Sequence, residues 1–153
     1  MIIGFTGTRQ GMTADQVLVV EGMLKSFAMD SAFLGLEFNH GDCIGADAMA
    51  HGLAKNCSYK VRVHPPLSDK YRAFCVGDYT EEPKEFLERN RAIVKRSTMM
   101  IATPKGFVEP GGLRGQGTWW TIAYATGHIK PLVIVYPNGE IQYHNMNEGQ
   151  IPV

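Results

Sequence analysis

Short apolar segments alternate with longer amphipathic segments along the chain. Apolar runs of this length, bounded by glycine and polar residues, are typical of strands buried in a sheet. We therefore predict five strands, which occupy Ile2–Phe5, Leu34–Phe38, Tyr59–Val63, Met99–Thr103 and Leu132–Tyr136.

The segments between these strands show helical spacing. Thr13 can cap a helix whose apolar residues Val17, Val20, Leu24 and Phe27 recur three or four positions apart. Three further helices are predicted, from Ala46 to Leu53, over Glu85–Arg96 with Phe86, Leu87, Ile93 and Val94 facing inward, and over Thr118–Thr126.

This alternation predicts an α/β fold, a Rossmann-like, doubly wound, mostly parallel five-stranded sheet with helices on both faces. We expect a single domain over residues 1–153, with the strands in the spatial order third, second, first, fourth, fifth. In that order the switch point lies between the first and fourth strands, where ligands bind beyond the carboxyl ends. Pro137-Asn138-Gly139-Glu140 predicts a turn, so residues 136–153 form an edge strand or a tail.

Composition narrows the classes of function. The 15 Lys and Arg residues balance the 15 Asp and Glu residues, so the basic excess of a general nucleic-acid binder is missing. Cys43, Cys57 and Cys75 follow no paired spacing and indicate free thiols in a reducing compartment. With no signal-peptide pattern and no apolar run long enough to span a membrane, we expect a cytoplasmic protein.

Several histidines and a cysteine raise the question of zinc. His40, Cys43, His51 and His64 match no established spacing of zinc ligands, and only the first two are close in sequence. We therefore expect no metal and no resident cofactor.

The strongest chemical signal is the glycine-rich segment from Glu109 to Thr118. Its glycines let backbone amides approach an anion without an obstructing Cβ atom, and the helix that follows has unpaired first amides. Such a segment is expected to bind phosphate, with an arginine adding a bidentate contact. The alternative is an ordinary glycine-rich surface turn. The expected contacts are Gly111, Gly112, Arg114, Gly115, Gly117 and Thr118.

Two other strands also end in residues suited to a ligand. After the first strand, Thr6, Gly7, Thr8 and Arg9 offer hydroxyls, backbone amides and a guanidinium for phosphate or ribose. The alternative is a plain turn with a surface arginine.

After the second strand, Gly41 and Gly45 permit a tight turn, and Asp42 and Asp47 are candidates for contacts to ribose or base. The alternative for Asp47 is a helix cap, where the dipole favours its carboxylate.

The helix over Glu85–Arg96 carries a further candidate pair, Arg89 and Asn90. Asn90 shares the face of the apolar residues, so its amide needs a partner, which is either structural or a ligand. The alternative for Arg89 is a solvated surface charge. The polar loop of about twenty residues before this helix is of a length that is usually functional or mobile.

Five short motifs, in this order, resemble small single-domain members of the SLOG superfamily. This superfamily of Rossmann-like nucleotide-binding domains is related to the cytokinin-activating phosphoribohydrolases and to DNA-processing proteins. The motifs are Gly7-Thr8-Arg9, Gly45-Ala46-Asp47, Lys70-Tyr71, Arg89-Asn90 and Gly117-Thr118-Trp119. The resemblance covers roughly residues 1–136 and adds Lys70 and Tyr71 to the expected site.

The resemblance implies a nucleotide or nucleotide-derived small molecule, bound at the carboxyl ends of the first, second and fourth strands. It also implies a sensor or sequestering protein for a signalling nucleotide, acting as a homo-oligomer. No membrane partner is expected.

Two other activities of the superfamily are alternatives. One is N-glycosidic cleavage of nucleoside monophosphates, for which the related hydrolases carry a glutamate where this chain has Thr121. A threonine cannot stabilise an oxocarbenium-like charge as a carboxylate can, so the pattern favours binding over this hydrolysis. The other is binding of single-stranded DNA, because Gly45–His51 resembles a strip of such proteins, although the neutral charge disfavours it.

Overall fold

A twisted sheet forms the centre of the computed structural model, which describes residues 1–30, 35–109 and 117–147. Its strands in chain order are β1 (Ile2–Gly7), β2 (Glu37–His40), β3 (Lys60–Val63), β4 (Tyr79–Thr80), β5 (Met99–Thr103), β6 (Leu132–Val135) and β7 (Ile141–His144). The spatial order is β4-β3-β2-β1-β5-β6-β7, and neighbouring strands are parallel except for β6 and β7.

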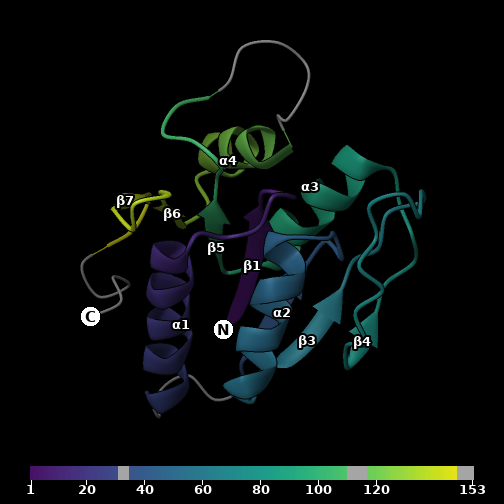
Figure 1. The fold of residues 1–153 in the computed structure, drawn as a ribbon, viewed down its shortest axis with the longest axis horizontal. Coiled ribbons are helices and arrows are strands. Elements are labelled where there is room, and N and C mark those ends of the chain that lie inside the picture. Colours follow the sequence, from purple (N-terminus) through teal and green to yellow (C-terminus); the bar gives the residue numbers. More distant parts are fainter. Residues whose placement is uncertain (31–34, 110–116, 148–153) are drawn as a thin grey trace.

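Helices cover both faces of the sheet. They are α1 (Ala14–Met29), α2 (Ala46–Asn56), α3 (Phe86–Arg96) and α4 (Gly117–Gly127). Figure 1 shows α1 and α2 in front of the sheet and α3 and α4 behind it. Two apolar cores result, one beneath α1 and α2 and one between the other face and α3 and α4. This is a doubly wound Rossmann-like arrangement.

The predicted fold class and the predicted order of the five expected strands are confirmed, since β3, β2, β1, β5 and β6 follow one another across the sheet. The predicted strand number was wrong, because β4 and β7 extend the two edges. Tyr79 and Thr80 of β4 are exposed and sit within the polar loop, so no apolar run marks them. The strand β7 returns antiparallel to β6 after the predicted turn at residues 137–140.

The start of α1 follows the sequence closely. Thr13 Oγ1 accepts a hydrogen bond from Gln16 N at 3.1 Å, and Gln16 Oε1 accepts one from Thr13 N at 3.0 Å. This reciprocal pair satisfies two amides that a helix start leaves unpaired. Within the described residues, no helix is both long and apolar enough to cross a bilayer.

The inward face predicted for α3 was partly wrong. Ile93 and Val94 are buried as expected, whereas Phe86 and Leu87 remain 42% and 40% exposed. Both belong to the first turn of the helix, where they border a cavity instead of the core. Periodicity identifies an apolar face but cannot tell a core from the wall of an open cavity.

Candidate functional site

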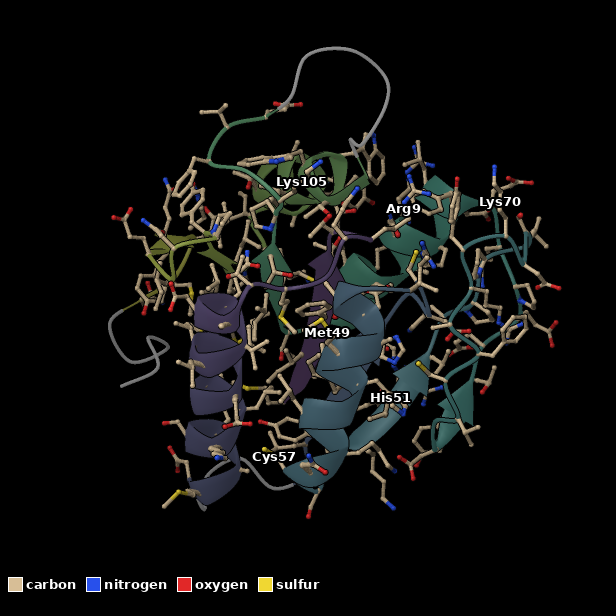
Figure 2. The ribbon with its side chains drawn as sticks, in the orientation of Figure 1. Arg9, Met49, His51, Cys57, Lys70 and Lys105 are labelled. Atoms are coloured by element: carbon tan, nitrogen blue, oxygen red, sulfur yellow. The ribbon has the colours of Figure 1, made fainter. Side chains whose placement is uncertain are left out.

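A cavity of about 850 Å³ opens at the carboxyl ends of β1, β2 and β5. Gly7 ends β1, Gly41 follows β2 and Lys105 follows β5, and all three line the cavity. Figure 2 shows Arg9 and Lys105 at the same end of the molecule as this edge of the sheet. The cavity therefore lies at the topological switch point between β1 and β5, where doubly wound folds bind ligands.

Many of the residues predicted from sequence meet in this cavity. Those that line it are Thr6, Gly7, Thr8, Arg9, Gly41, Asp47, Tyr71, Arg89, Asn90, Gly117 and Thr118. Asp42, Gly45 and Lys70 do not line it. Gly111, Gly112, Arg114 and Gly115 lie outside the described residues. Segments far apart in the sequence thus contribute to one site, as the predicted topology requires.

Asp42 supports the site and does not face the cavity. Its buried carboxylate accepts hydrogen bonds from Arg72 Nε at 2.7 Å and from Cys75 N at 2.8 Å. The backbone after β2 is also bonded to the loop between β3 and β4, since Ile44 N donates to Tyr71 O at 2.9 Å. These bonds tie the loop between β3 and β4 to the end of β2, so that Tyr71 reaches the cavity.

Tyr71 and Arg9 form one wall of the cavity. The Arg9 guanidinium carbon lies 3.8 Å from the centre of the Tyr71 ring, a cation–π contact. Lys70 Nζ lies 5.1 Å from the same ring centre, outside the lining. The stacking holds the guanidinium of Arg9 over the cavity while leaving its N–H groups available to an anion.

Gly45 contributes by letting α2 approach the Arg9 loop. Its φ is +87°, and a Cβ atom there would lie 2.2 Å from Arg9 O. The adjacent Ala46 N donates to Thr8 O at 3.0 Å, which fixes the loop against the start of α2. A Cβ on Gly7 would lie 2.5 Å from the Cβ of Ala46, so this approach requires glycine on both sides.

The buried guanidinium of Arg89 is held by neutral oxygens. Arg89 is 3% exposed, and its Nε donates to Asn90 Oδ1 at 2.7 Å while Nη1 donates to the carbonyls of Gly41 and His64. Among the described residues no carboxylate lies within ion-pairing distance of it. Burial lowers the pKa of Arg89, which reflects the cost of a buried cation without a close counter-charge.

Asp47 is the carboxylate of the cavity wall. Its Oδ2 accepts hydrogen bonds from Gly41 N at 3.1 Å and Cys43 N at 3.2 Å. Burial raises the pKa of Asp47 to about 6, although the positive charge of Arg89 opposes the shift. The pKa of the neighbouring Cys43 thiol is raised to about 11 by burial and by the Asp47 charge, so this thiol stays protonated at neutral pH.

The further residues that line the cavity are mostly apolar or aromatic, and sequence analysis did not name them as contacts to a ligand. The additional lining residues are Phe5, Gln10, Cys43, Phe86, Leu87, Ile93, Lys105, Gly106, Val108, Trp119 and Trp120. The sequence signal for the two tryptophans is their place in the first turn of the helix that follows the glycine-rich segment. Lys105 lies two residues after the end of β5, at the same edge of the sheet as Arg9.

Thr121 does not offer its hydroxyl to the cavity. It is 1% exposed, and its Oγ1 donates to Gly117 O one turn earlier at 2.8 Å. The residue at the position of the hydrolases' glutamate therefore satisfies its own polar group within α4.

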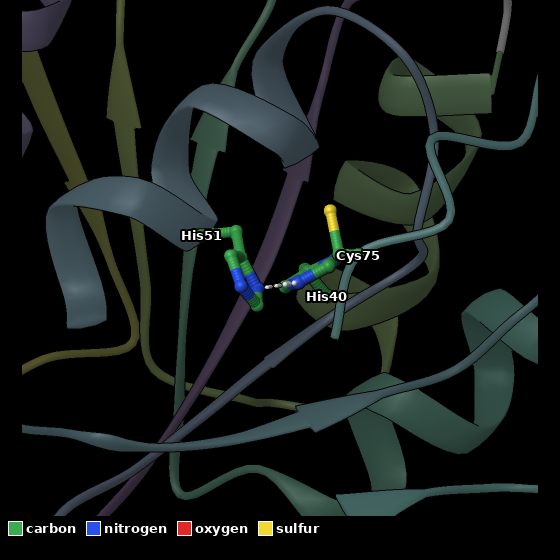
Figure 3. Close-up of side chains that lie close together, drawn as sticks. All are labelled: His40, His51 and Cys75. Atoms are coloured by element: carbon green, nitrogen blue, oxygen red, sulfur yellow. Dashed lines mark hydrogen bonds between the residues drawn. The ribbon is translucent and has the colours of Figure 1, made fainter. Parts of the chain in front are cut away.

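His40, His51 and Cys75 also come together, with their potential ligand atoms within 4.8 Å of one another (Figure 3). However, Asp42 N donates to His40 Nδ1 at 2.9 Å, so the proton of the neutral ring sits on Nε2. That proton points to His51 Nδ1, 3.0 Å away. A metal at His40 Nε2 would require the proton on Nδ1, against the backbone N–H group. The cluster is a satisfied hydrogen-bond chain.

Comparisons with known proteins show that the fold is shared with solved structures. No protein-family model matches the chain, and no curated protein matches it in sequence. A solved structure of the molybdenum cofactor binding protein from Rippkaea orientalis is similar, with 20% identity and a TM-score of 0.65 over 88% of this chain and 76% of that one. The Moco Carrier Protein from Chlamydomonas reinhardtii gives 20% identity and 0.57 over 87% and 74%.

A third similar structure, that of TM1055, gives 12% identity and a TM-score of 0.57 over 86% of this chain and 71% of that one. Likeness at these identities shows a shared fold. Fold and cavity together define a Rossmann-like α/β protein with a cavity at the switch point of its sheet.

Proposed function

We propose that this protein binds a nucleotide or nucleotide-derived anion in the switch-point cavity, as a small member of the SLOG superfamily. The observation that carries the proposal is the buried Arg89 guanidinium, which lines the cavity without a close carboxylate partner among the described residues. Buried charges are normally paired, because an uncompensated one is costly. An anionic ligand would supply the missing charge.

The remaining charges support an anionic ligand. Among the described residues, the cavity is lined by three cations, Arg9, Arg89 and Lys105, against one carboxylate, Asp47. The chain as a whole is neutral, so this excess is local. Gly117 and Thr118 add the start of α4, whose first amides have no partner within the helix.

Size and lining support a ligand that also carries a ring. The volume of about 850 Å³ is within the range of small-molecule sites. Phe86, Trp119 and Trp120 offer flat apolar surfaces, which suit a stacked heterocycle. A sensor or sequestering role in a homo-oligomer is the part of the proposal that only solution experiments can test.

A second candidate ligand is the molybdenum cofactor, after which two of the structurally similar proteins are named. The shared fold and the cationic cavity favour including it. The alternative of N-glycosidic cleavage needs a carboxylate in the cavity. Thr121 is turned away, and among the described residues Asp47 is the carboxylate that lines the cavity, so Asp47 would have that role.

The test begins with the purified protein. Mass spectrometry under native conditions and elemental analysis for molybdenum would identify a copurified ligand. Isothermal titration with AMP, GMP and inorganic phosphate would follow, and assays for free base would detect cleavage. We expect at least one nucleotide to bind more tightly than inorganic phosphate. Arg9→Gln should weaken the affinity for that nucleotide at least tenfold.

Lys25→Gln is the matched control, because it removes one positive charge from an exposed pair on α1, outside the cavity. It should leave the affinity unchanged. If Arg9→Gln and Lys25→Gln behave alike, or if no nucleotide binds, the proposal is wrong. Oligonucleotide binding that weakens steeply with salt would instead favour the DNA alternative.

A further inference from the structure

The cavity wall around Gly41 holds an acceptor and a donor in fixed orientations. Gly41 N donates to Asp47 Oδ2, while its carbonyl accepts from Arg89 Nη1. A Cβ atom on Gly41 would lie 2.6 Å from Arg89 Nη1, so the backbone packs directly against the guanidinium. Asp47 and Arg89 are thereby fixed by hydrogen bonds to the same residue, Gly41.

The unused atom of Asp47 is its Oδ1. Oδ2 is occupied by two backbone amides, whereas Oδ1 has no hydrogen-bond partner among the described residues. Asp47 is 5% exposed and lines the cavity, so a ligand in the cavity can reach Oδ1. An ionised carboxylate oxygen only accepts hydrogen bonds, so the ligand must donate there.

The side-chain amide of Asn90 is oriented so that it offers a hydrogen-bond donor to the cavity. Because Arg89 Nε donates to Asn90 Oδ1 at 2.7 Å, the Asn90 oxygen is taken and its NH₂ group remains. Asn90 is 6% exposed and also lines the cavity. This wall thus offers a buried acceptor and a buried donor to the same ligand.

We propose that Asp47 and Asn90 recognise the edge of a heterocycle in which N–H and amino donors adjoin a carbonyl oxygen. The 2-amino-6-oxo edge of guanine has this order, with the N1–H and 2-amino donors for Asp47 Oδ1 and the carbonyl oxygen as an acceptor for the Asn90 amide. The inference rests on the proposed function and names the ring that the bound anion carries. Adenine lacks the ring N–H and the carbonyl oxygen, so this wall selects against it. Pterins carry the same edge as guanine.

Asp47→Asn gives a sharp test, because its orientation is determined in advance. The amide oxygen must still accept from Gly41 N and Cys43 N, so the new NH₂ group takes the place of Oδ1. The wall then offers a donor where it offered an acceptor. Xanthine differs from guanine by an oxygen in place of the 2-amino group, so the variant should prefer xanthine.

The experiment is titration calorimetry of the wild type and Asp47→Asn with GMP, XMP, AMP and 6-hydroxymethylpterin. We expect the wild type to bind GMP at least tenfold more tightly than AMP or XMP, and Asp47→Asn to reverse the order of GMP and XMP. Asp69→Asn is the control, because its exposed carboxylate lies outside the cavity. Circular dichroism would verify that both variants fold.

The outcomes separate the two proposals. Equal binding of AMP and GMP, or GMP binding that Asp47→Asn leaves unchanged, would overturn the proposed recognition of the ring edge. The proposal of nucleotide binding would stand. Binding of the pterin alone, lost in Asp47→Asn, would overturn the nucleotide and keep the ring edge. Failure of all four ligands would overturn both.

Discussion

Arg72 Nε donates to the buried Oδ2 of Asp42 at 2.7 Å, and this ion pair anchors the loop between β3 and β4 to the end of β2. Asp42 has no exposed surface, whereas the Arg72 side chain is 22% exposed. The pair is therefore asymmetric. Loss of the arginine strands a buried carboxylate, whereas loss of the carboxylate leaves a cation that water can reach.

The first prediction concerns this ion pair. Arg72→Met should lower the free energy of unfolding by about 3 kcal/mol, because a buried charge loses its partner. Urea denaturation at pH 7 would measure it. Lys25→Met, which breaks an exposed pair on α1, should cost less than about 0.5 kcal/mol. Equal costs for the two variants would mean that Arg72 does not anchor the loop.

The second prediction concerns the approach of α2 to the Arg9 loop. Gly45→Ala places a Cβ atom 2.2 Å from Arg9 O at a φ of +87°, so it should destabilise the protein by about 3 kcal/mol. Gly52→Ala, within α2 itself, places a Cβ atom that meets no atom within 4 Å and should stabilise the protein by about 0.5 to 1 kcal/mol. Thermal unfolding of both variants should show shifts of opposite sign.

The third prediction concerns pH. Burial lowers the pKa of His64 to about 4 from an ordinary value of 6.5. Between pH 6.5 and 4, His64 therefore binds a proton in the unfolded chain but stays neutral in the folded protein. The contribution of neutral His64 to the free energy of unfolding is complete above pH 6.5 and is lost as the pH falls toward 4. Between pH 7 and 5 the loss from His64 should be about 2 kcal/mol.

His64→Gln isolates that contribution, because other groups titrate in the same range. His40, whose pKa is also lowered by burial, acts in the same direction, while the raised pKa of Asp47 favours the folded state at lower pH. These effects are common to the wild type and the variant. Urea denaturation at pH 7 and pH 5 should therefore show a smaller loss in His64→Gln, and an identical loss would refute the role of His64.

The fourth prediction concerns Gln16, which joins α1 to the ends of β5 and β6. Its buried Nε2 donates to Pro104 O and Val135 O, both at 2.9 Å. Gln16→Met leaves two carbonyls and a capping amide without partners, so it should cost about 3 kcal/mol. It should also weaken ligand binding, since Pro104 precedes Lys105. Gln142→Met on the exposed edge strand is the control and should change neither quantity.

Sequence patterns predicted most of the architecture because they are local. The capping box at Thr13, the apolar run of β5 and the helical spacing of α1 depend on residues within a few positions of one another. Alternation of strand and helix then leaves few topologies, and the observed order of the five predicted strands follows. The short strand β4 was not predicted, because its two exposed residues show no hydrophobic pattern.

The sequence by itself determined the doubly wound fold and the edge of the sheet at which glycines, Arg9 and Asn90 gather. Only the tertiary structure decided what each polar side chain does there. It turned Asp42 toward Arg72 and not toward the cavity, and it buried Arg89 against carbonyl oxygens. It also left Oδ1 of Asp47 without a partner among the residues that the structure describes. The reason is physical: a hydrogen-bond partner distant in sequence is chosen by packing between elements, which no local period encodes.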